Sequence, residues 1–90
     1  MIVLKKLKLD IENSNYSLEL SVQELHSKSE GSYPQFYVSL FRDSDEITFF
    51  EPNDLGLALD YYNELEEYIT EKSRLYNEME SRLTTIYKNS

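Results

Sequence analysis

Residues 6–22 read KLKLDIENSNYSLELSV, in which apolar and polar side chains alternate on both sides of a short polar break. An alternation with a period of two predicts strands that have one buried and one exposed face. Residues 13–15 are Asn-Ser-Asn, a combination that favours a turn. With Ser14-Asn15 as a two-residue loop, residues 7–11 pair with residues 18–22 and one face of the pair is apolar throughout. The segment therefore predicts an antiparallel hairpin.

A second hairpin is predicted after a polar segment. Residues 26–34 contain glycine, proline and several serines, and this composition predicts a loop. The next strand begins near residue 35, and a turn at residues 43–45 leads to a fourth strand. Pairing residues 38–42 with residues 47–51 places Phe49 on the same face as Val38 and Leu40. The opposite face then carries the aromatic residues Tyr37, Phe41 and Phe50.

The remainder of the chain predicts one long helix. Pro52 ends the fourth strand because it has no N–H to donate, and Asn53 or Asp54 can cap the helix that follows. No proline occurs after Pro52. The sequence thus predicts a single α+β domain over residues 1–90: a four-stranded antiparallel sheet of two hairpins over residues 1–51, followed by a long C-terminal helix over residues 53–88.

This helix is too long for the sheet. It would measure about 50 Å, whereas a seven-residue strand measures about 23 Å. Residues at alternating three- and four-residue steps form a heptad stripe that continues past the expected end of the sheet. The distal half either pairs with a second copy, giving a homodimer, or breaks near residues 70–73 and folds back. The residues expected to mediate self-association are Tyr76, Met79, Leu83 and Ile86.

Charge and composition limit the classes of function. The chain has a net charge of −8, and residues 43–67 hold nine acidic and no basic residues. Such a surface repels a phosphate backbone, so the expected partner is a protein with a basic surface and not nucleic acid itself. Without cysteine, with a single histidine and with no phosphate-binding or nucleophile motif, we expect no enzyme activity, cofactor or metal. No apolar run is long enough to span a membrane, and a cytoplasmic location is expected.

Three groups of residues are candidates for binding. The first is a row of acidic residues on one face of the helix, at steps of 4, 3, 4 and 7; its members are Asp60, Glu64, Glu67, Glu71 and Glu78. The second is the aromatic sheet face of Tyr37, Phe41 and Phe50, because one helix covers only one face of a sheet. The third is a basic patch of Lys5, Lys6 and Lys8, interpreted as the solvent face of an edge strand.

In size and charge the chain resembles small acidic inhibitors from phages and mobile elements that block host nucleic-acid-handling proteins. The resemblance implies a non-catalytic protein that occupies the basic nucleic-acid groove of a host protein. The element order also resembles that of the transcriptional-coactivator type of single-strand DNA-binding domain, which dimerises. The alternative expectation is therefore a dimeric structural or adaptor protein that binds through its aromatic sheet face, or a single-strand DNA-binding-like dimer.

Overall fold

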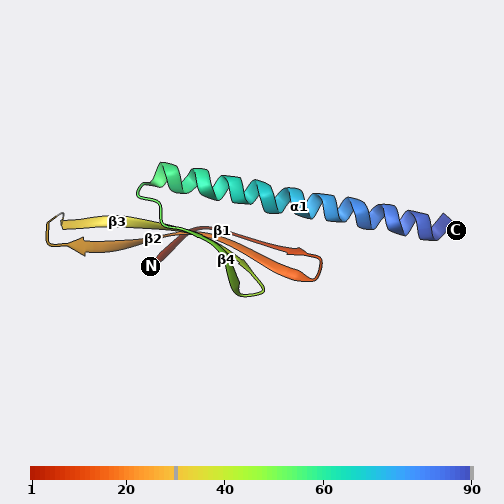
Figure 1. Cartoon of the computed structure of the whole chain (residues 1–90), viewed down its shortest axis with the longest axis horizontal. Coiled ribbons are helices and arrows are strands. Elements are labelled where there is room, and N and C mark those ends of the chain that lie inside the picture. Colours follow the sequence, from red (N-terminus) through yellow and green to blue (C-terminus); the bar gives the residue numbers. More distant parts are fainter. Residues whose placement is uncertain (30, 90) are drawn as a thin grey trace.

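A four-stranded antiparallel sheet with one helix across one of its faces forms the protein (Figure 1). The computed structural model describes residues 1–29 and 31–89, with side chains up to residue 83. The strands lie in the order β1-β2-β3-β4, which confirms the predicted fold class. The elements are β1 (Ile2–Ile11), β2 (Ser14–Ser27), β3 (Gly31–Arg42), β4 (Asp45–Phe50) and α1 (Leu55–Asn89).

The β1–β2 hairpin forms as predicted, but in a different register. Glu12 and Asn13 form the turn with φ values of 52° and 66°, so that Ile11 pairs with Ser14 and Leu7 with Leu18. Two consecutive positive φ values are typical of a type I′ turn, whose twist matches that of the strands. The predicted turn at residues 14–15 was wrong. The turn lies two residues earlier, so each residue of β1 pairs with a β2 residue four positions earlier than predicted. Because this shift is even, the same side chains still face the core.

Residues 26–34, predicted to be a loop, lie mostly in strands. β2 and β3 continue to Ser27 and Gly31, and they project as a two-stranded ribbon past the start of α1 (Figure 1). Pro34 lies inside β3, opposite Glu24. A proline is tolerated there because the pairing with β4 involves only residues 38–42, which leaves this part of β3 with one neighbour. We call residues 23–29 and 31–35 the arm.

A bulge in the β3–β4 hairpin reverses the prediction for two phenylalanines. Phe41 pairs with Glu46, but Leu40 pairs with Thr48, so Ile47 is an extra residue in β4. A one-residue shift exchanges the faces of a strand. Phe50 therefore lies opposite Val38 on the helix side of the sheet, and Phe49 lies on the open side.

The core lies between α1 and the first three strands. Tyr62 and Ile69 of α1 are 1% and 0% exposed, and they pack on strand residues such as Leu18 and Val38, both 0% exposed. The 3.6-residue period of the helix brings positions 58, 62, 65 and 69 onto one face, which matches the apolar side of the sheet. The predicted stripe thus serves as an intramolecular core in the proximal half of α1.

The helix is continuous from Leu55 to Asn89, which excludes the predicted alternative of a break near residues 70–73. Its distal half projects past the β1–β2 hairpin, giving overall dimensions of 71 × 23 × 16 Å (Figure 1). The N-terminus is capped by Asp54, whose Oδ1 accepts a hydrogen bond of 2.8 Å from the Leu57 N–H. Of the two N-cap candidates, the structure therefore selects Asp54 over Asn53.

Replacing Asp54 with alanine should lower the free energy of unfolding by about 1 kcal/mol, because the Leu57 N–H loses its acceptor. The matched control is Asn53→Ala, which removes a neighbouring polar side chain that does not cap the helix and should change little. Urea denaturation of both variants measures the difference. Equal losses at the two positions would contradict this cap.

Candidate protein-interaction surfaces

The predicted acidic row lies on the outer face of α1, away from the sheet. All five of its side chains, those of Asp60, Glu64, Glu67, Glu71 and Glu78, are exposed. Helical periodicity brings them together, because residues three or four apart are neighbours on a helix surface, about 5–6 Å between Cβ atoms. We call this surface the acidic face.

A single arginine divides the acidic face into two parts. Arg74 forms ion pairs with Glu71 and, over 2.9 Å, with Glu78. The hydrogen bonds from Arg74 hold the pKa of the Glu71 carboxyl below its ordinary value, and Glu71 in turn raises the pKa of Arg74. Asp60, Glu64 and Glu67 have no lysine or arginine at ion-pair distance within the described residues. The uncompensated negative charge is therefore concentrated in the proximal half.

The open sheet face carries an aromatic group that differs from the predicted one. Tyr37 stacks on Phe49 with ring centroids 5.9 Å apart, and Phe41 lies on the same face, half-buried. Phe50 was predicted here and is instead stacked on Tyr61 of α1, with centroids 4.4 Å apart. The β4 bulge causes the exchange, so the aromatic face consists of Tyr37, Phe41 and Phe49.

Two of the three lysines of the predicted basic patch lie beside these aromatic residues. In the register of the sheet, Lys8 lies opposite Ser17 of β2, and Ser17 lies opposite Phe41 of β3. Lys6 forms an ion pair of 2.9 Å with Glu19. Both lysines line a hollow of about 540 Å³ that also includes Phe41. Lys5 lies on the other side of β1, after an irregularity in that strand, with its Nζ 4.8 Å from the centre of the Tyr62 ring.

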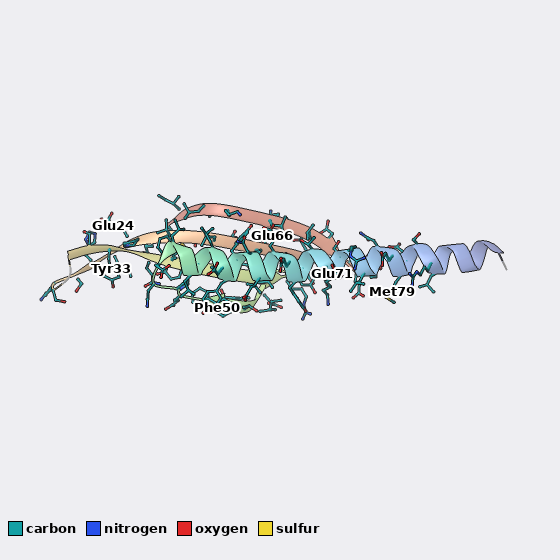
Figure 2. The ribbon with its side chains drawn as sticks, turned by 90° about the horizontal axis from the view of Figure 1, so that it is seen from above. Glu24, Tyr33, Phe50, Glu66, Glu71 and Met79 are labelled. Carbon is teal, nitrogen blue, oxygen red and sulfur yellow. The ribbon has the colours of Figure 1, made fainter. Side chains whose placement is uncertain are left out.

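The residues predicted to mediate self-association have different environments. Tyr76 is half-buried and packs against the core. Met79 and Leu83 are 62% and 53% exposed, and Figure 2 shows Met79 past the end of the sheet. The side chain of Ile86 lies outside the described residues. Tyr76 thus packs against the core of its own chain, whereas the side chains of Met79 and Leu83 are exposed.

Two features were missed by the sequence-based prediction. One is the arm, on which Figure 2 shows Glu24 and Tyr33 away from the helix. The other is a row of exposed apolar residues along one flank of α1, including Leu57, Tyr68 and Leu75. The spacing of 7 residues between Tyr61, Tyr68 and Leu75 was a signal for this row. It was overlooked because the heptad stripe next to it accounted for the burial of the helix.

No three His, Cys, Asp or Glu side chains in residues 1–29 and 31–89 are grouped to hold a metal. His26 lies in the arm, where its Nδ1 is 2.8 Å from the Ser32 Oγ. Burial raises the pKa of Tyr62, and the nearby Glu66 carboxylate adds to this shift. No helix in the described residues is long and apolar enough to cross a membrane.

No family model, curated protein or solved structure matches this chain. Its own geometry and charge are therefore the basis for the function proposed below.

Proposed function

We propose that this protein is a non-catalytic, acidic binding protein whose acidic face occupies the basic nucleic-acid groove of a partner protein. The observation that carries this proposal is the exposed, uncompensated set of Asp60, Glu64 and Glu67 on the outer side of a rigid helix. A regular helix holds charges at fixed spacing, so binding orders only their side chains.

Charge and spacing both support a groove that otherwise binds phosphates. Neighbouring positions on the acidic face are about 5–6 Å apart between Cβ atoms, a spacing similar to that between phosphates along a nucleic-acid strand. Electrostatic complementarity would accelerate association and exclude acidic competitors. The net charge of −8 gives the attraction a long range at low salt. A protein inhibitor related in function to those of phages and mobile elements would have these properties.

A second candidate function is binding through the open sheet face. The specific observation that favours it is the position of Lys6 and Lys8 on the same face as Tyr37, Phe41 and Phe49. Aromatic rings beside basic side chains are the elements used to stack and neutralise single-stranded nucleic acid. On this face the Glu19 carboxylate pairs with Lys6 and neutralises its charge. An adaptor role through the aromatic residues is therefore favoured over binding of single-stranded nucleic acid.

The double variant Asp60→Lys/Glu67→Lys tests the first proposal. The unmodified protein, immobilised, is used to capture a partner from a lysate of the native host, and affinity is then measured by titration. The variant should bind at least about 30-fold more weakly, because two repulsive charges face a basic groove. The affinity of the unmodified protein should also fall steeply with added salt.

The matched control is Glu12→Lys/Glu24→Lys, which changes the net charge equally but on exposed residues of the turn and the arm. It should retain most of the affinity. Tyr37→Ser/Phe49→Ser distinguishes the second candidate, because it removes the aromatic stack and leaves the acidic face unchanged. Loss of binding in this aromatic variant, with full binding after charge reversal, would replace the first proposal by the second.

A further inference from the structure

The open sheet face has a bulky half and a small half. Figure 1 shows α1 on the other side of the sheet. The bulky half is the aromatic face, on β3 and β4. The small half is on β2, where Ser17 and Ser21 lie opposite Phe41 and Tyr37 in the register of the sheet. The hollow of about 540 Å³ described above lies at this step in size, because both Ser17 and Phe41 line it.

Two rows of paired residues cross the open sheet face, and in each row the charge also changes from one edge to the other. In the order β1 to β4, the first row is Lys8, Ser17, Phe41 and Glu46. In the same order, the second row is Lys6, Glu19, Ser39 and Phe49. Each row begins with a lysine and ends with an acidic or an aromatic residue. Each row is therefore complementary to its own reverse.

A twofold axis parallel to the strands, between β2 and β3, places each row over its own reverse. A second copy turned about this axis would place its Phe41 over Ser17, in the hollow, and its Glu46 over Lys8. In the second row, its Phe49 would lie over Lys6, an arrangement that suits a cation–π contact. Twofold symmetry repeats every contact. An axis across the strands would instead place β1 over β1, with lysines facing lysines.

The shape of the chain is compatible with this contact. A twofold axis parallel to the strands gives the two facing surfaces the same twist, so that they follow each other as the sheets of a β-sandwich do. The two α1 helices then lie on the outer sides, with both sheets between them. Each chain has a net charge of −8, and this arrangement keeps the two acidic faces far apart.

The open sheet face is also large enough for a stable contact. From Ser17 to Leu25, β2 is paired with β3 over nine residues, a length of about 30 Å, and four strands are about 19 Å wide. Because the arm has only two strands, the footprint is about 500 Å² per copy, and the total of about 1,000 Å² reaches the size of specific interfaces. In the arm, the same axis would place Tyr33 of one copy over Leu25 of the other.

We propose that the open sheet face binds a second copy of this chain, with the twofold axis parallel to the strands and between β2 and β3. The layers of this dimer are helix, sheet, sheet and helix. The acidic faces of α1 remain free on both outer sides, so the dimer is compatible with the groove-binding function proposed above and does not depend on it. It uses a different surface from the self-association expected through Tyr76, Met79, Leu83 and Ile86.

Charge reversal in the first row tests both the contact and its orientation. Lys8→Glu and Glu46→Lys should each weaken dimerisation by at least about tenfold, because each creates two pairs of like charges. Within one chain these residues lie three strands apart, about 14 Å, and so do not form an ion pair with each other. An equimolar mixture of the two variants should recover affinity to within about threefold of the unmodified protein, because a mixed dimer contains two pairs of opposite charges.

Two controls make the same changes of charge outside the contact. Asp45→Lys alters the residue next to Glu46, whose side chain lies on the helix side of β4, and Lys28→Glu alters an exposed residue at the tip of the arm. Both should leave dimerisation unchanged. Sedimentation equilibrium measures dimerisation, and circular dichroism verifies that each variant stays folded. A strictly monomeric unmodified protein at tens of micromolar, single variants no weaker than their controls, or a mixture no better than its components would refute the proposal.

Discussion

Replacing Ile69 with alanine should lower the free energy of unfolding by about 2–5 kcal/mol. Ile69 is 0% exposed and belongs to the core between α1 and the sheet. Removal of its side chain leaves a cavity that a regular helix cannot close. Because small domains are stable by only about 5–15 kcal/mol, this loss should move the urea midpoint substantially.

The control for this prediction is Leu55→Ala, which removes a similar side chain from the first turn of the same helix. Leu55 is 45% exposed, so its loss should change stability by about 0.5 kcal/mol or less. Both variants have the same net charge as the unmodified protein, so the comparison isolates burial. A small effect at Ile69 would mean that α1 is not packed on the sheet in this register.

Replacing Phe50 with alanine should cost about 2 kcal/mol, whereas the same change at Phe49 should cost less than about 1 kcal/mol. Phe50 is half-buried and stacks on Tyr61, with ring planes inclined by 6°. Phe49 is 43% exposed and stacks on Tyr37 at the surface. The two residues are chemically identical neighbours, so each is the matched control for the other.

The comparison tests the bulge in β4 directly. In the pairing expected from the alternation of side chains, Phe49 faces the core and the order of the two effects is reversed. Urea denaturation of the two variants distinguishes the registers. A larger loss at Phe49 than at Phe50 would show that the bulge at Ile47 is absent.

Much of the architecture could be read from local patterns. The alternation in residues 6–22 defined two strands and their buried side, and this side survived an error of four residues in register because the error was even. Capping chemistry limited the N-cap to Asn53 or Asp54, and the absence of proline predicted the helix that follows; the structure selected Asp54 and excluded a break near residues 70–73. The acidic face could also be predicted, because helical periodicity depends only on position along the chain.

Other features depend on contacts between distant residues. The alternation of side chains cannot reveal that Ile47 is an extra residue, because the bulge exists only when β4 is paired with β3 and Phe50 meets Tyr61. That single insertion moved Phe50 from the predicted aromatic face to the helix side. Likewise, both stripes of α1 are apolar, and the position of the helix over β1, β2 and β3 selects the one that is buried. The physical reason is that burial is a property of pairs of surfaces, whereas periodicity is a property of one segment.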